Sequence, residues 1–472
     1  MKAGTWEAPT GVMIPFWTEN GLIDTVDVAT RKAYDVDMAV LPIAIQMERN
    51  GIPLNIATLK DIEREKRPEW ERLFAEMRSF VGPIPAHVVK DAGPFNPQSP
   101  IQLQWVLYAP DGPCKLTAPK TTDSGAPSAD KDALAKLADH TFVQTLLKWR
   151  TINHAFSNYV YGKKLIVRED GRVHPQWNTT GARTGRWSSS PNFQNWPRWL
   201  RRCIEAPAGY TIVGADYAQL ELRIMAALCG DPELIRRCRD ADENRKLEPE
   251  WDPHSFVASH FFKEAFLELS LNDPAHTASS DCKCETCRRK ALREVVKSCI
   301  YGLNYGAGAR TVLEAIYKKG YEGMPLNLQI VQQAIDVIFE LFPGIRTWRE
   351  NTLEWSIEHE QVRSSLLNRW RTFPWGDVKA PTAWNFPIQS TAADIINLRL
   401  IVLAERLKAF PTAQIMAQVH DALYVICRDE DAEEIKRIVT ESMSVVLQLV
   451  PGAPEMPFNA SAKSGKTWDK VS

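Results

Sequence analysis

Hydrophobic and polar positions along the chain follow two periods, and the change between them outlines the expected elements. Residues 57–80, 99–108, 131–161 and most of 232–357 have the three-to-four-residue spacing of helices. The segment AQIMAQVHDALYVICR, residues 413–428, instead reads as two short apolar strands about a polar turn. A helix of about twenty residues and a last strand are expected after it. Because the strands are separated by helical blocks, the pattern predicts an α+β architecture.

The segment LREVVKSCIYGLNYGAG, residues 292–308, is predicted to form a helix with an unusual face. Steps of four place four side chains along one side of a helix, and here they are Arg293, Lys297, Tyr301 and Tyr305. The packed side is expected to contain Val295, Val296, Ile300 and Leu303. Two cations one turn apart suit a string of phosphates, and a tyrosine one turn further suits a sugar or a base. A solvated charged face is an equally good interpretation of this helix alone.

Two aspartates far apart in the sequence lie where a carboxylate can stand above a sheet. Asp216 follows the expected strand TIVGA, and Asp421 lies in the turn of the expected hairpin. Two carboxylates from neighbouring strands can hold a pair of Mg²⁺ ions, which suits displacement at phosphorus. Taken singly, each aspartate is better explained as a residue of a turn.

Composition narrows the class of protein. The chain has 472 residues, 44% of them hydrophobic and 24% charged, a net charge of −1 and a pI near 6.8. These values exclude a uniformly basic nucleic-acid binder but allow a basic groove in a neutral protein. No signal core or membrane-spanning run is expected. The nine cysteines are mostly scattered, which favours a reducing cytoplasm over a disulfide framework.

One group of cysteines is an exception to that scatter. Cys282, Cys284 and Cys287 have C-x-C-x₂-C spacing, and His276 lies close by in the sequence. Thiolates and an imidazole could hold Zn²⁺ tetrahedrally. An exposed loop that carries thiols is the alternative, and it stays open because most structural zinc sites have two separated ligand pairs.

Several segments, in order, resemble the motifs of family A DNA polymerases. DYAQLELR (216–223), RxxxKxxxYGxxYG (293–306) and QVHDALYV (418–425) are similar to motifs A, B and C. TGRWSSSPNFQN (184–195) and NFPIQSTAAD (385–394) resemble two further family segments. QMERNGIPLN (46–55) and FNPQSPIQLQWVL (95–107) resemble parts of its thumb. Ordered motifs over residues 37–472 make coincidence a poor explanation.

The resemblance implies a right-hand fold, with an antiparallel palm sheet, helical fingers and a helical thumb. The segments expected from it are an N-terminal extension (1–36), the thumb (37–165), the first part of the palm (166–235), the fingers (236–354, with a cysteine-containing insertion at 271–290) and the second part of the palm (355–472).

The resemblance also implies roles for individual residues. Asp216 and Asp421, with the main-chain carbonyl of Tyr217, would hold two Mg²⁺ ions, and Lys297 would assist the chemistry. Residues implied to contact the incoming nucleotide are Arg293, Lys297, Tyr301, Glu221, His254, Gln219 and Tyr305. Residues implied to contact primer or template are Arg186, Asn192, Gln194, Asn195, Asn385, Gln389 and His420. Arg223, Arg369 and Arg371 suit either a DNA contact or a structural role.

The implied activity is template-directed DNA synthesis from dNTPs on a primer–template, with release of pyrophosphate, by a monomer.

Motif C departs from the family pattern, because Ala422 stands where most members have Glu. Residues 1–36 are too few for a proofreading domain, so no exonuclease is expected within the 472 residues, and a separate exonuclease or replication protein is a candidate partner.

Three rival functions fit parts of the pattern. A single-subunit RNA polymerase shares the palm but lacks the DYAQLELR pattern. An inactive DNA-binding module need not keep both aspartates. A metal nuclease leaves Arg293, Lys297 and Tyr301 unexplained.

Tyr301 generates the first prediction, because many family members have phenylalanine there and a tyrosine accompanies poor rejection of dideoxynucleotides. We predict ready incorporation of dideoxynucleotides, and restored discrimination in Tyr301→Phe, which lacks the hydroxyl that replaces the missing 3′-OH contact. The measurement is the ratio of kcat/KM for deoxy- and dideoxynucleotides. Strong rejection of dideoxynucleotides by the unmutated protein would contradict it.

Overall fold

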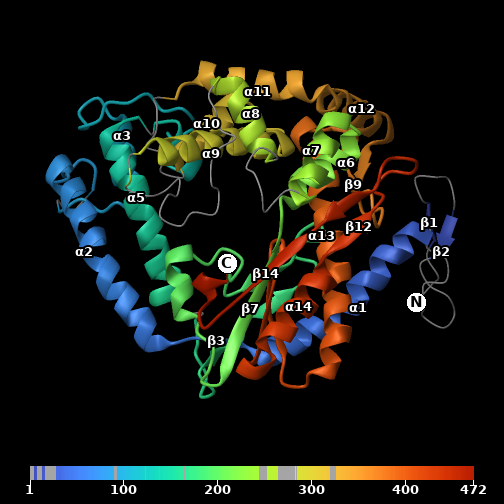
Figure 1. Ribbon diagram of the computed structural model, residues 1–472. Coiled ribbons are helices and arrows are strands. Elements are labelled where there is room, and N and C mark those ends of the chain that lie inside the picture. The colour runs from blue at the N-terminus through green and yellow to red at the C-terminus, as the bar shows by residue number, and fades with distance from the viewer. Residues whose placement is uncertain are drawn as a thin grey trace.

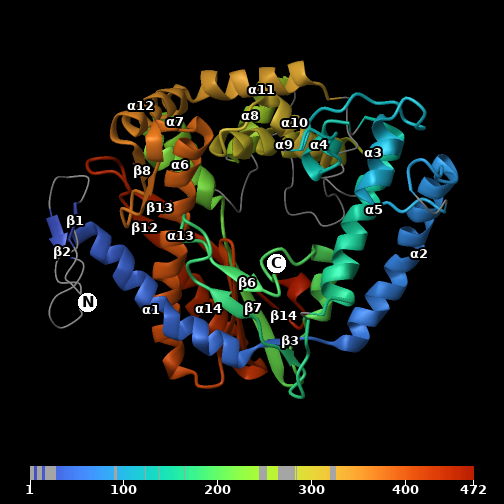
Figure 2. The same cartoon turned by 180° about the vertical axis from the view of Figure 1, so that it is seen from behind.

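The computed structural model describes residues 28–471, except 90–92, 123, 138, 164, 244–251, 264–281, 283 and 319–325, together with the short strands β1 (Thr5–Glu7) and β2 (Met13–Pro15). Three helical and sheet regions surround a central space (Figures 1 and 2). Together they give the palm, fingers and thumb that the family resemblance implied, and the predicted α+β class is confirmed.

The base of this arrangement is a four-stranded antiparallel sheet in the order β10-β11-β7-β14. Its strands are β7 (Tyr210–Tyr217), β10 (Gln414–Val419), β11 (Ala422–Arg428) and β14 (Ala460–Gly465). Near-continuous apolar runs in β7, β10 and β11 are buried, as expected of strands covered on both faces. The helices α13 (Ala380–Arg406) and α14 (Ala432–Met443) pack beside it, and α14 contacts β7 and β14.

The fingers are helices that lie across the top of Figure 1. They are α8 (Pro253–Phe262), α9 (Glu285–Asn304), α10 (Ala309–Lys318), α11 (Leu328–Leu341) and α12 (Pro343–His359), joined to the palm through α6 (Leu220–Cys229) and α7 (Pro232–Glu243). The predicted packed side of α9 is confirmed, because Val295, Val296, Ile300 and Leu303 are at most 3% exposed. Gly306, at φ +65°, ends α9 so close to Pro381 that a Cβ would lie 2.5 Å from its Cα. The end of α9 is therefore fixed against α13.

The thumb has a hydrophobic core of its own, in which Leu146 and Trp149 of α5 pack with Leu73 and Met77 of α2. Its elements are α2 (Ile56–Val81), α3 (Pro100–Tyr108), α4 (Lys131–Ala135), α5 (Thr141–Ala155) and the π-helical turn Phe156–Val160. The short helix α4 reaches α10 of the fingers, so thumb and fingers touch at one end of the central space (Figure 2).

A long helix, α1 (Val28–Asn50), crosses the palm and packs on α13. Arg369 links the two helices, since its guanidinium donates to Asp37 of α1 at 2.7 Å and to Asp394 of α13 at 2.5 Å. Arg223 is 2% exposed and donates to the carbonyls of Ala218 and Pro457. Both arginines therefore have structural contacts.

The remaining strands form short pairs around these regions. They are β3 (Ile52–Pro53), β4 (Arg172–Val173), β5 (Gln176–Asn178), β6 (Ser188–Ser190), β8 (Gln361–Arg363), β9 (Trp370–Thr372), β12 (Val445–Leu447) and β13 (Met456–Phe458).

Several expectations about the elements were wrong. Residues 131–161 do not form one helix, because His140 caps a new helix at Thr141 after a turn. The helix after the hairpin has 12 residues, and three strands follow it instead of one. The expected boundaries after residues 36, 235 and 354 fall inside α1, α7 and α12. Within the described residues, the helical stretch Ala380–Ala409 is long and apolar enough to span a membrane, but 72% of its apolar window is buried inside the protein, as in a core helix.

Candidate active site

The centre of the candidate site is a pair of carboxylates from two neighbouring strands. The register of β7 and β11 places Asp216 opposite Ala422, so Asp421, one residue earlier, lies beside it. Asp421 and His420 form the two-residue turn that closes the β10–β11 hairpin at the Val419–Ala422 pair. His420 has φ +55°, the left-handed conformation that such a tight turn requires. Each carboxyl group affects the pKa of the other, so the structure brings the two aspartates close together.

The electrostatics of this pair suit a bound cation. Burial by the surrounding cleft, and then the charge of Asp421, raise the pKa of Asp216 to about 7, although its side chain is open to solvent on one side. Burial raises the pKa of Asp421 as well. In the described part of the chain, neither carboxylate forms an ion pair with Lys or Arg. Two close carboxylates without a cationic partner are oxygen ligands that fit divalent cations.

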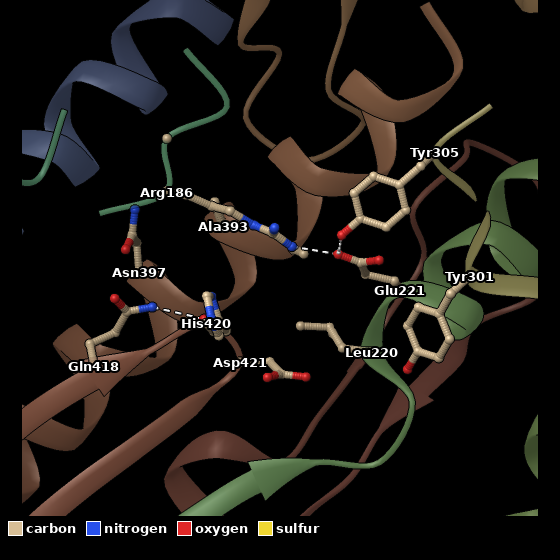
Figure 3. A pocket seen from close by; sticks show the side chains of 12 residues that line it. Arg186, Leu220, Glu221, Tyr301, Tyr305, Ala393, Asn397, Gln418, His420 and Asp421 are labelled. Atoms are coloured by element: carbon tan, nitrogen blue, oxygen red, sulfur yellow. Dashed lines mark hydrogen bonds and ion pairs between the residues drawn. The ribbon is translucent and has the colours of Figure 1, made fainter. Parts of the chain in front are cut away.

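A cavity of about 250 Å³ adjoins Asp421 (Figure 3). Six of the predicted site residues line it, from the palm, the fingers and the segment before β6: Arg186, Glu221, Tyr301, Tyr305, His420 and Asp421. Glu221 is 8% exposed; it accepts a hydrogen bond from the Tyr305 hydroxyl at 3.1 Å and pairs with Arg186. Burial, and then the Glu221 charge, raise the pKa of the Tyr305 phenol. The contact therefore ties the end of α9 to the floor of the cavity.

Arg293, the first of the two cations predicted along one side of α9, does not project freely into the cleft. Arg293 is buried against Asp252, to which Nε and Nη2 donate at 2.7 Å each. Lys297, one turn further, is 37% exposed on its side chain and has only a 3.6 Å contact with Glu294. The two predicted cations therefore differ in this structure: Lys297 is open, and Arg293 is held in one orientation.

Asp252 is the site residue that sequence reasoning missed. Its side chain caps α8 by accepting from the Ser255 amide at 2.7 Å, and it also accepts from Gln219 Nε2 at 3.1 Å. Burial raises its pKa, but the Arg293 charge outweighs this and holds the pKa of Asp252 well below its usual range. The signal in the sequence is Asp252-Pro253-His254, in which an Asp before a Pro marks a helix start.

His254 completes this wall of the site. It is fully buried, its ring is parallel to Tyr301 with centroids 6.4 Å apart, and its Nδ1 lies 3.4 Å from both Asp252 and Gln219. Burial lowers its pKa, so the imidazole is neutral near pH 7. Gln219, His254, Arg293 and Tyr301, predicted from three separate segments, are thus brought together.

The predicted contacts to primer or template are less concentrated. Arg186 and His420 line the cavity, and Asn385 of α13 donates to the Asn304 carbonyl at the end of α9, at 3.3 Å. Asn192 and Asn195 are exposed and joined by a 3.1 Å hydrogen bond in one turn. Gln194 is nearly buried and accepts from Ser189, while Gln389 is half-buried on α13.

The three predicted thiol ligands also converge. The sulfur atoms of Cys282, Cys284 and Cys287 lie within 4.8 Å of one another at the start of α9. His276 lies outside the described residues.

Comparisons with known proteins identify one family. The family model of DNA polymerase family A matches residues 68–470. The thermostable DNA polymerase I of Thermus aquaticus is 29% identical over 451 residues, which cover 92% of this chain and 48% of that protein. The DNA polymerase I of Aquifex aeolicus is 28% identical, with 92% of this chain and 67% of that protein covered. This chain thus spans about half the length of the Thermus relatives.

A solved structure is similar over the same region. The POL domain of Pol1 from M. smegmatis, in complex with DNA primer-template and dNTP, has a TM-score of 0.71 and 28% identity. The similarity covers 92% of this chain and 70% of that one.

The carboxylate pair predicts an unusual dependence of stability on pH. The folded-state pKa of Asp216, about 7, exceeds the unfolded value of about 3.9, so the stability that its protonated form contributes is lost as pH rises through 7. Asp216→Asn removes this penalty. In metal-free buffer, its Tm should exceed that of the unmutated protein at pH 8, by a margin that shrinks toward pH 5.

Asp429→Asn is the matched control, because Thr211 and Lys466 donate to that carboxylate and hold its pKa below the usual value. It should not raise the Tm at pH 8. An Asp216→Asn protein with an unchanged or lower Tm at pH 8 would contradict the electrostatic account.

Proposed function

This chain belongs to DNA polymerase family A, and we propose that its site adds deoxynucleotides to the 3′ end of a primer, directed by a DNA template. The observation that carries the proposal is the Asp216–Asp421 pair beside the α9 wall of Lys297, Arg293 and Tyr301. The first group suits bound cations and the second suits a triphosphate and its sugar. The partners are therefore primer–template DNA and dNTPs, and the products are an extended primer and pyrophosphate.

Asp216 and Asp421, helped by the Tyr217 carbonyl, are the residues that would hold two Mg²⁺ ions. When bound, such ions lower the pKa of an attacking hydroxyl and stabilise charge on a leaving pyrophosphate. The fit is supported by the raised pKa of both carboxyl groups, because burial disfavours their ionised forms and a bound cation would offset that cost. A structural Zn²⁺ ion at the three cysteines is a separate part of the proposed cofactor set.

The α9 wall would bind and orient the triphosphate. Lys297 is open and can contact phosphate oxygens directly, and it is also suited to protonate the leaving group. Arg293 uses Nε and Nη2 on Asp252, so Nη1, which lies 3.2 Å from Glu294, is the nitrogen left to contact a phosphate. Asp252 is therefore a positioning residue, because it fixes the plane of the guanidinium before the nucleotide arrives.

Glu221 and Tyr301 would select the sugar. Glu221 is buried in the cavity floor, so its side chain occupies space that a ribose 2′-hydroxyl would need. Tyr301 lines the same cavity and is packed against His254. This rigid floor supports selection of dNTPs over NTPs by exclusion.

The contact among Arg186, Glu221 and Tyr305 would also respond to the presence of a base pair. A templating base entering near Tyr305 displaces the phenol from Glu221 and releases Arg186 toward the minor groove, whose acceptors lie at similar positions in every correct pair. Movement of α9 with this exchange is consistent with specificity through closing of the fingers.

Primer extension tests the proposed function. With Mg²⁺ and a labelled primer–template, the protein should incorporate dNTPs and strongly prefer them to NTPs. Asp216→Ala and Asp421→Ala should each reduce the rate by about a thousandfold or more, equivalent to about 4 kcal/mol of transition-state stabilisation.

Other outcomes favour the rival functions. DNA binding without extension would indicate an inactive binding module. A preference for NTPs would indicate an RNA polymerase, and degradation of the DNA without synthesis would indicate a nuclease. Full activity of the Asp216→Ala protein would remove the carboxylate pair from the mechanism.

The role of Asp252 gives a separate prediction. Asp252→Asn keeps the helix cap but weakens the hold on Arg293, so the KM for dNTPs should rise about tenfold, or about 1.4 kcal/mol, with a smaller change in kcat. Glu294→Gln is the matched control on the same arginine and should change KM much less, since Glu294 is half-exposed. Equal KM values for the two variants would contradict a positioning role for Asp252.

A further inference from the structure

The three cysteines at the start of α9 form a cluster that the polymerase chemistry does not use. Their sulfur atoms come from the segment before the helix, its N-cap and its first turn, yet all lie within 4.8 Å of one another. Cys287 is 5% exposed, and Cys282 and Cys284 are half-buried. Two of the three therefore converge without the full burial that would explain the grouping as apolar packing.

The spacing of the sulfur atoms fits one metal ion. Sulfur ligands at about 2.3 Å from a tetrahedral Zn²⁺ lie about 3.8 Å apart, which is within the observed limit. No disulfide joins any pair of them. An iron–sulfur cluster would distribute three cysteine ligands over at least two iron atoms, which spreads them further apart than three ligands on a single ion.

The electrostatic surroundings favour thiolates, the form of cysteine that binds metal. Cys284 is the N-cap residue of α9 and forms no side-chain cap hydrogen bond, so its sulfur lies at the positive end of the helix dipole. Arg288 and Arg289 also lie in the first turns, where both contact Glu285. A metal–thiolate group would place its negative charge at this positive end of the helix.

We propose that Cys282, Cys284 and Cys287 bind one structural Zn²⁺ ion, which fixes the first turn of α9 and thereby the position of Arg293. Arg293 is six residues, or about 9 Å, along the same helix from Cys287. The other end of α9 is already fixed by Gly306 against Pro381. With the ion bound, α9 would be fixed at both ends, and the α9 wall of Arg293, Lys297 and Tyr301 would lie between the two fixed points.

The metal site stands on the cysteine geometry alone, whereas its effect on the nucleotide rests on the proposed function. Three thiolates leave one tetrahedral position for a fourth ligand, which the described residues do not supply. The ion is structural because it lies at the helix start and not at the carboxylate pair.

Metal analysis tests the site itself. Protein purified without chelators should contain one zinc per chain by elemental analysis, and replacement by Co²⁺ should give the visible bands and sulfur-to-metal charge transfer of tetrahedral thiolate coordination. Cys284→Ser should lose the zinc and these bands. The control Cys114→Ser alters a half-buried cysteine of the thumb and should retain both. Absence of zinc and of cobalt thiolate bands in the unmutated protein, or iron in place of zinc, would overturn the proposal.

Nucleotide kinetics test the role of the ion. The KM for dNTPs should rise about tenfold in Cys284→Ser and stay unchanged in Cys114→Ser. If Cys284→Ser does not fold, zinc is displaced from the unmutated protein with a mercurial, released metal is followed with a chromogenic chelator, and KM is measured before and after. Zinc loss without a change in KM would overturn the positioning role. An unmutated protein that binds zinc but does not extend primers would overturn the proposed function and leave the metal site intact.

Discussion

The register between β7 and β11 is the constraint on which the rest of the site depends. It sets Asp216 opposite Ala422, so the carboxylate that ends one strand lies beside the carboxylate in the turn before the other. A shift of one residue would turn Asp216 to the other face of the sheet and separate the pair. The buried apolar residues of β7 and β11 hold that register, and so the hydrophobic core keeps two acidic groups together against their mutual repulsion. A site that is electrostatically unfavourable when empty is suited to bind cations.

The fingers helix α9 shows how a second set of groups is brought to this pair. Its apolar side is buried, its C-terminal end is fixed against α13 by Gly306, and its polar stripe divides into two kinds of group. Arg293 is oriented by Asp252, whereas Lys297 stays open. Tyr305 reaches Glu221 on the palm, so the wall and the floor of the cavity are in contact in this structure. Binding of a nucleotide and a templating base would have to break this contact, which joins chemistry at the palm to movement of the fingers.

The sequence predicted the α+β class, the hairpin around Asp421 and the packed side of α9, because each follows from a local period of apolar residues. The family motifs added the convergence of Asp216 and Asp421, which periodicity cannot supply since the two lie far apart in the chain. What local pattern could not predict was pairing between distant polar groups. The burial of Arg293 against Asp252 depends on where α8 packs on α9, and the structural use of Arg223 and Arg369 depends on carboxylates and carbonyls from other segments. Two of the three strands after α14, β12 and β13, were missed because each has only three residues.

The central claim is that Asp216 and Asp421 bind the same divalent cations. The most direct measurement is anomalous diffraction from crystals of the protein grown with Mn²⁺, a primer–template lacking a 3′-hydroxyl and the next matching dNTP. The account predicts anomalous peaks between the two carboxylates and the triphosphate, with oxygen atoms of both aspartates as ligands. Peaks that contact only one of the two aspartates, or lie away from both, would contradict it.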